Sequence, residues 1–228
     1  MRSVAIAAAI ALGAGSQAAH AQIFPGEGPA PTAFPSAFSF SLLAAFAGDL
    51  RVTHTYVDSA AACLPCTILH STTGTMGLAV RYQMPIGPRT GVRFGATISG
   101  PKRKRRDINA NQVLVESTRL RLFRGEMLLM FKLKPQVPIY FGVGGSVASF
   151  SPGPLAGQQD ITELGGAAVI GVDKAMGARV ATRFEWTLYG TKPKTTGLNS
   201  EFVAEGLALD SQMSFGVNLY LRPKPPAP

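Results

Sequence analysis

The sequence has few of the residues that carry redox and metal chemistry, with 2 cysteines and 3 histidines among 228 residues. It is also poor in charge, since only 15% of its residues are charged and basic residues (22) outnumber acidic ones (13). No apolar run after residue 21 approaches the ~20 residues that a transmembrane helix needs, which excludes helical spans there. Yet 46% of the residues are hydrophobic. A membrane β-barrel fits this composition, because its apolar residues alternate along strands and produce no hydropathy peak.

The first 21 residues have the features of a secretory signal peptide. Arg2 supplies the positive start, residues 4–14 form a short apolar core, and residues 19–21 (AHA) are a cleavage site of the A-x-A type. We therefore expect Sec-dependent export to the cell outer membrane, in an oxidising compartment where disulfides persist. Proline-rich residues 22–36 and 223–228 are predicted to be a periplasmic tether and a C-terminal tail, on either side of a barrel that spans residues 37–222.

Apolar residues in the predicted barrel recur at every second position, which is typical of strands. The alternation predicts eight strands, at residues 38–46, 75–84, 91–99, 122–133, 139–147, 162–172, 179–189 and 212–221. Three connections are short and four are long, at about 48–72, 100–118, 149–160 and 190–210, as in barrels with short periplasmic turns and long external loops. The predicted fold class is all-β, an eight-stranded antiparallel up-and-down transmembrane β-barrel. A soluble β-sandwich is the alternative, but it does not need large apolar residues on the outer face of every strand.

The polar face of these strands carries charges of both signs. An eight-stranded barrel is just filled by side chains, and charges buried there must pair to offset their desolvation. The predicted lumen ion-pair network consists of Arg81, Arg93, Arg124, Glu126, Glu163, Arg183 and Glu185. Upstream of residue 123 the pattern breaks, because Leu120 and Leu122 share the parity of the lumen charges. Either a bulge or a strand that continues above the membrane would explain the break.

Three stretches resemble a known family. Residues 138–146 (PIYFGVGGS) are similar to its glycine–aromatic strand, and residues 214–221 (SFGVNLYL) are similar to its closing strand. Residues 165–189 are similar to its hairpin, with Arg183, Glu185 and Trp186 at the R-x-E-Y positions. On these residues the chain resembles the small outer-membrane β-barrel proteins of Gram-negative bacteria, the OmpA/OmpX-like and opacity-type barrel domains. The resemblance implies the barrel fold and no particular activity.

Both cysteines and two of the three histidines lie within residues 54–70, in the first long loop. The haem signature C-x-x-C-H is absent there. A zinc site of four ligands has a suitable Cys-x2-Cys spacing and would use His54, Cys63, Cys66 and His70. Its thiolates would have to survive outside a reducing compartment, so we favour a Cys63–Cys66 disulfide that staples the loop.

The second long loop contains a basic run, Lys102, Arg103, Lys104, Arg105 and Arg106. In an exported chain such a run does not indicate a nucleic-acid partner. Just above a membrane, its side chains would meet the phosphates of lipopolysaccharide, to which they donate strong charge-assisted hydrogen bonds. A solvated loop tip is the alternative interpretation.

The sequence offers no strand histidine that could act as a base beside a serine. We therefore expect no enzyme and no cofactor. The predicted function is that of a structural, envelope-interaction or adhesion-type surface protein with a filled lumen. Its external loops would contact outer-membrane lipid, lipopolysaccharide, or an external protein or host-surface ligand. The alternatives are a narrow-channel or lateral-path transporter of small or hydrophobic solutes and a lipid A-modifying enzyme. The sequence assigns no oligomeric state.

Overall fold

The computed structural model describes residues 36–47, 50–54, 66–87, 89–107, 113–133, 138–153, 159–177, 179–192, 202–204 and 207–221. The regular secondary structure of these residues consists of thirteen strands. Within the same ranges, no helix is long and apolar enough to cross a membrane. The predicted signal peptide and C-terminal tail, and all of the tether except Ser36, lie outside the described residues.

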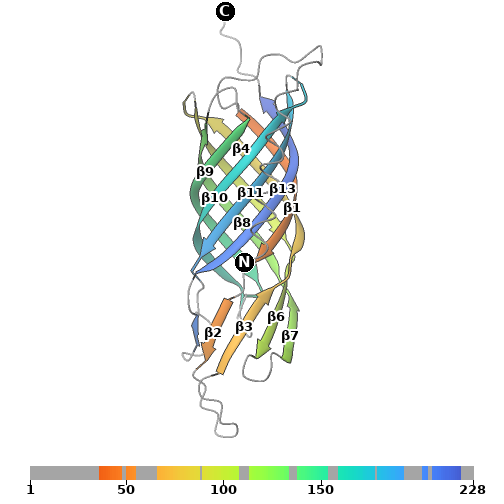
Figure 1. The fold of residues 1–228 in the computed structure, drawn as a ribbon, viewed down its shortest axis with the longest axis vertical. Helices are drawn as coiled ribbons and strands as arrows, with labels where there is room; N and C mark the ends of the chain where they lie inside the picture. Colours follow the sequence, from red (N-terminus) through yellow and green to blue (C-terminus); the bar gives the residue numbers. More distant parts are fainter. Residues whose placement is uncertain are drawn as a thin grey trace, which may run out of the picture.

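Eight strands close into an antiparallel barrel (Figure 1). They are β1 (Ser36–Ala47), β4 (Thr75–Pro85), β5 (Thr90–Ser99), β8 (Arg121–Lys132), β9 (Ile139–Ser151), β10 (Ile161–Ala175), β11 (Val180–Thr191) and β13 (Ala208–Leu221). Each strand pairs with the next barrel strand along the chain, and β1 completes the ring by pairing with both β4 and β13. The structure confirms the all-β class and the eight-stranded up-and-down barrel, and the closed strand order rules out the sandwich.

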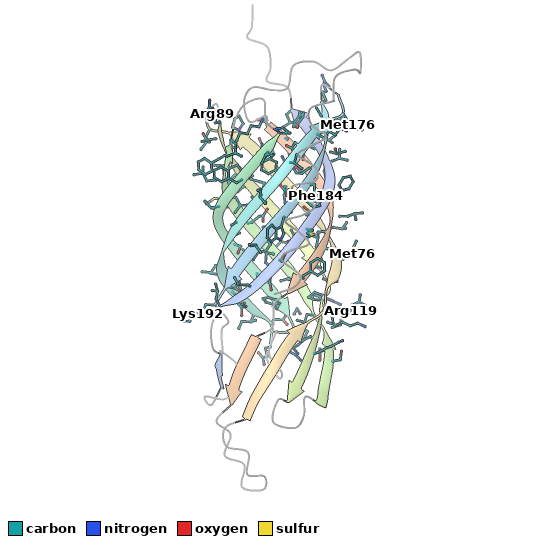
Figure 2. The ribbon with its side chains drawn as sticks, viewed as in Figure 1. Met76, Arg89, Arg119, Met176, Phe184 and Lys192 are labelled. Carbon is teal, nitrogen blue, oxygen red and sulfur yellow. The ribbon has the colours of Figure 1, made fainter. Side chains whose placement is uncertain are left out.

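The period of two in the sequence places apolar side chains on the outside of this barrel and polar ones inside. On β1, for example, Phe40 is 51% exposed, whereas its neighbour Ser41 is 6% exposed. Figure 2 shows side chains around the outer surface, with Arg89 and Met176 at one end of the barrel and Arg119 and Lys192 at the other. The first of these ends carries the short turns, and β1 begins and β13 ends there.

A second sheet continues the barrel wall at the other end. Its strands, in spatial order, are β12 (Phe202–Ala204), β2 (Leu50–His54), β3 (Cys66–Thr72), β6 (Lys102–Asp107) and β7 (Val113–Arg119). These strands adjoin β13, β1, β4, β5 and β8 in the chain, and their spatial order is that of these five barrel strands. Five neighbouring strands therefore extend beyond the barrel as one sheet, which we call the extension sheet (Figure 1).

The extension sheet corrects the prediction of four long external loops. Residues 48–72, 100–118 and 190–210 each contain at least one of its strands. The prediction was wrong because the strands of the extension sheet are only three to seven residues long. Segments this short show too few alternating positions to be told from loop sequence.

The phase break before residue 123 has a structural cause as well. Leu120 and Leu122 are buried toward the lumen and Phe123 faces outward, so β8 keeps its phase. Of the two predicted explanations, the continuing strand is present, because β7 extends the wall in the extension sheet. A register shift between Arg105 and Arg106 lies farther away, opposite Leu114 and Glu116, and does not cause the break. The two leucines belong to an apolar cluster inside the wall, formed by Leu120, Leu122, Ala148, Phe150 and Ile161.

Candidate functional site

Four charged side chains from four strands meet inside the barrel, and we call them the central lumen cluster: Arg81 (β4), Arg93 (β5), Glu126 (β8) and Glu185 (β11). Arg81 Nε donates to Glu126 Oε1 at 3.3 Å, and Arg81 Nη1 lies 3.3 Å from Glu185 Oε2. Arg93 Nη2 lies 3.0 Å from Glu126 Oε1, and Arg93 Nη1 pairs with Glu185. Each carboxylate of the cluster therefore forms ion pairs with both of its arginines. All four side chains are at most 1% exposed, so these pairs are out of contact with bulk water.

Two tyrosines donate hydrogen bonds to the carboxylates. Tyr140 of β9 donates its hydroxyl to Glu185 Oε1 at 2.6 Å, and Tyr189 of β11 donates to Glu126 Oε2 at 2.7 Å. The guanidinium of Arg124 stands 4.0 Å above the centre of the Tyr189 ring, a cation–π contact. Sequence reasoning missed both tyrosines because they are neutral. Their lumen-facing parity was the signal that could have found them.

Two further ion pairs extend the network toward the barrel ends. Near the short turns, Arg183 donates from Nε and Nη2 to the two carboxylate oxygens of Asp173, at 2.8 Å each, and its Nη1 lies 3.6 Å from Glu185. Near the extension sheet, Arg124 pairs with Asp210. Both aspartates were missed, because they stand at the ends of β10 and β13, in segments that the sequence assigned to a turn and a loop.

Two glycines provide the space in which the cluster side chains lie. Gly95 is the cross-strand partner of Glu126, and a Cβ on it would stand 2.6 Å from Glu126 Oε1. Gly171 is the partner of Tyr140, and a Cβ there would stand 2.3 Å from the hydroxyl oxygen. Each glycine therefore lets its partner's side chain lie across the neighbouring strand, which is one use of glycine within a sheet.

Apolar side chains occupy the lumen around these charges. One buried cluster contains Leu128, Met130, Tyr140, Ala167, Val169 and Tyr189, and the cluster around Leu120 and Leu122 lies nearer the extension sheet. Of the seven residues predicted as the lumen network, six take part in the ion pairs described above. The seventh, Glu163, is buried on β10 opposite Ala148. The described barrel strands therefore bury both ionic and apolar side chains in the lumen.

The basic run that was predicted at a loop tip forms most of β6. For Arg103, the second residue of the run, the prediction of lipid contact was wrong, because its side chain is buried, at 3% exposure. Arg103 Nη1 donates to the Gly153 carbonyl at 2.9 Å, and Nη2 donates to Thr118 Oγ1 at 3.3 Å. This guanidinium binds protein groups in the segment after β9 and in β7, and it does not face a lipid phosphate.

The other four basic residues of the run lie on the same strand. Lys102 is exposed and Lys104 is half-buried. Arg105 and Arg106 pair with β3 through the backbone, and their side chains lie outside the described set. Among the described side chains of the run, Lys102 is therefore the one most available to an external anion.

The cysteine–histidine window falls partly on the extension sheet. His54 of β2 is the cross-strand partner of Cys66 of β3, whereas Cys63 lies outside the described residues, so the Cys63–Cys66 disulfide stays a prediction. The four-ligand zinc set of His54, Cys63, Cys66 and His70 stays a prediction for the same reason. Among the described residues, no group of three or more His, Cys, Asp or Glu is placed to hold a metal ion.

A closed eight-stranded barrel with an apolar outer surface and buried polar side chains inside is the architecture of small outer-membrane barrels. No protein-family model matches the chain, and no curated protein matches it by sequence. Solved structures of outer-membrane proteins share its fold, among them the following two. The crystal structure of the outer membrane protein OprG from Pseudomonas aeruginosa has a TM-score of 0.59 at 9% identity, over 86% of this chain and 100% of that one. The solid-state NMR structure of the outer membrane protein AlkL in DMPC lipid bilayers has a TM-score of 0.51 at 12% identity, over 91% of this chain and 99% of that one.

At these identities the likeness shows the fold alone. The chain has the fold of the small outer-membrane barrels, as the glycine–aromatic strands predicted. The narrower likeness to OmpA/OmpX-like and opacity-type barrels remains a resemblance carried by the sequence stretches described above.

Proposed function

We propose that this protein is a non-enzymatic outer-membrane barrel with a closed lumen, which acts at the cell surface through its extension sheet. The observation that carries the proposal is the central lumen cluster, in which two carboxylates and two arginines from four strands meet with at most 1% exposure. A lumen closed in this way leaves the outer ends of the strands as the part that can act on other molecules.

The apolar outer wall supports the location. Large side chains such as Phe40, Leu78 and Phe215 are more than half exposed, and a bilayer removes that surface from water. Short turns face the periplasm in barrels of this kind, and the extension sheet lies at the opposite end. The sheet would then face outward, toward lipopolysaccharide, an external protein or a host surface.

Single-channel recording in planar bilayers tests the closed lumen. The full chain, refolded and inserted, should show no steady open state. Arg81→Ala with Glu126→Ala removes one arginine and one carboxylate from the lumen without changing its net charge, and should produce openings. The matched control is Val80→Ala with Met127→Ala, which shortens the neighbouring outward-facing side chains on the same two strands and should stay closed. A steady open state of the unaltered chain would contradict the proposal.

A narrow polar channel is the second candidate, and one observation favours it. Thr187 Oγ1, Gln212 Nε2 and Asn218 Nδ2 are buried on β11 and β13, and they have no hydrogen-bond partner among the described residues. Thr187 and Gln212 are cross-strand partners. Buried polar groups without a protein partner can hydrogen-bond to small polar solutes that pass one after another along a narrow channel. The same recordings separate the two candidates, because a channel of this kind conducts without any substitution.

The absence of catalysis is part of the proposal, and it has its own measurement. The described barrel strands contain no histidine, so a serine there has no imidazole base beside it. Mass spectrometry of lipid A from cells with and without the protein should give the same acylation and phosphorylation pattern. A change of pattern that depends on the protein would favour the lipid-modifying alternative.

A further inference from the structure

The outer surface changes from apolar to basic where β5 passes into β6 and β7 passes into β8. Ile98 and Phe123 are cross-strand partners, and both face outward with more than half of their surface exposed. Residues two and four positions beyond them have the same parity and belong to the same face of the wall. In order, they are Gly100 and Lys102 on one strand, and Arg121 and Arg119 on the other.

This face concentrates positive charge. Lys102 and Arg119 are exposed cross-strand partners, and Arg121 is exposed two residues further along the chain. Like charges opposite each other on one face of a sheet repel. Within the part of the chain that the structure describes, no carboxylate forms an ion pair with any of the three. An anion bound between them would relieve the repulsion.

A hollow lies beside these cations. It has a volume of about 580 Å³ and is lined by Gly100, Arg119, Leu120, Arg121, Ser151 and Pro152. Gly100 contributes no side chain, and Arg119 Nε lies 3.6 Å from the position that a Cβ of Gly100 would take. Ser151 is the cross-strand partner of Arg121, so a hydroxyl borders the hollow on its β9 side. The hollow thus has two guanidinium-bearing residues and one hydroxyl around its wall.

We propose that Lys102, Arg119 and Arg121 bind the phosphate group of an outer-leaflet membrane lipid in this hollow. The proposal rests on the outer-membrane location proposed above. A guanidinium presents parallel N–H donors that match phosphate oxygens, and the ammonium of Lys102 adds charge. Ile98 and Phe123, on the barrel side of the cations, provide apolar surface for the acyl chains of the same lipid. Arg119 and Arg121 lie at the junction of β7 and β8 and are not part of the basic run of β6.

Titration of the refolded full chain with bisphosphorylated lipid A, followed by native mass spectrometry, tests the site. Arg119→Gln with Arg121→Gln should weaken binding at least about tenfold, because it removes two charge-assisted donors. Arg89→Gln with Arg179→Gln is the matched control, since it removes two exposed arginines at the short-turn end, and it should bind like the unaltered chain. Gly100→Val keeps every charge and fills the hollow, so it should also weaken binding.

The lipid probes distinguish the source of the phosphate. Lipid A stripped of phosphate should bind weakly to the unaltered chain, and inorganic phosphate should displace bisphosphorylated lipid A only in large excess. Equal binding by the Arg119→Gln/Arg121→Gln chain, or equal loss in the short-turn control, would overturn the site. Displacement by equimolar inorganic phosphate would overturn the lipid assignment. Each variant is first checked for the heat-dependent gel shift of a folded barrel. Its absence in the unaltered chain would count against the proposed function, whereas a folded chain that binds no lipid A counts against the site alone.

Discussion

Glu185→Gln should destabilise the barrel more than any other single charge removal in the lumen. Glu185 is fully buried and contacts four groups, which are Arg81, Arg93, Arg183 and the Tyr140 hydroxyl. The inner network balances three arginines with three carboxylates, namely Arg81, Arg93, Arg183, Glu126, Asp173 and Glu185. Glutamine keeps the shape and leaves one guanidinium charge uncompensated. We expect a loss of about 3–5 kcal/mol in the free energy of unfolding, the range for breaking a buried pair from one side.

Urea unfolding of the chain in lipid vesicles measures this loss. The reporter is Trp186, the only tryptophan of the sequence, which stands beside Glu185 and donates to Ser211 Oγ at 2.7 Å. Asp210→Asn is the matched control, because that carboxylate lies near the barrel end and is partly exposed, so its loss should be smaller. Arg93→Met with Glu185→Met leaves two arginines and two carboxylates, and should recover part of the stability. A loss below about 1 kcal/mol for Glu185→Gln would refute the reasoning, since a buried charge left unpaired costs more than that.

Three further outcomes are expected. Gly171→Val should lower the free energy of unfolding by about 1–3 kcal/mol, the usual cost of overpacking, because its Cβ would meet the Tyr140 hydroxyl. The control is Gly145→Val, whose Cβ would have no neighbour closer than 3.9 Å, and it should be tolerated in the same urea assay. Val143→Lys, on the outer face near the middle of β9, should cost about 2–4 kcal/mol in vesicles, and Met176→Lys at the short turns about 0–1 kcal/mol; equal costs would contradict a bilayer around the wall. Ser117→Cys on β7 should react with a membrane-impermeant maleimide on intact cells above the background of the unaltered chain, whereas Arg179→Cys should not, and the reverse result would invert the proposed orientation.

The alternation predicted the barrel because all of its strands meet the same requirement on their outer face. Every second residue of β1 or β4 must be apolar to face lipid, so apolar residues recur in the sequence with a period of two. The same parity pointed Arg81, Arg93 and Glu126 into the lumen. Which arginine meets which carboxylate depends on strand tilt and on the positions of Gly95 and Gly171, and no periodicity encodes these.

The extension sheet could not be predicted in this way, since its strands are too short to show a clear period of two. β6 reads as a loop tip because five of its six residues are basic. The structure nevertheless buries Arg103 against Gly153 and Thr118, residues that are distant from it in the sequence. Asp173 and Asp210 were missed because each was assigned to a connection from its neighbours in the chain. Asp173 meets Arg183, its partner across the β10–β11 hairpin, whereas only the closed barrel brings Asp210 to Arg124.

The cost of burying the lumen charges is best understood together with the apolar wall. Replacing a buried ion pair by apolar groups is often neutral or stabilising, so the central lumen cluster does not hold the barrel together more strongly than an apolar core would. An apolar lumen, however, would make both faces of every strand apolar. A slip of one residue in register would then exchange two similar faces at little cost. With Arg81, Glu126 and Glu185 inside, the same slip places charge against lipid, at ~2–4 kcal/mol for each arginine near the middle of the bilayer. The charges inside the barrel therefore define which face of each strand is the outer one, and they oppose slips of one residue in register.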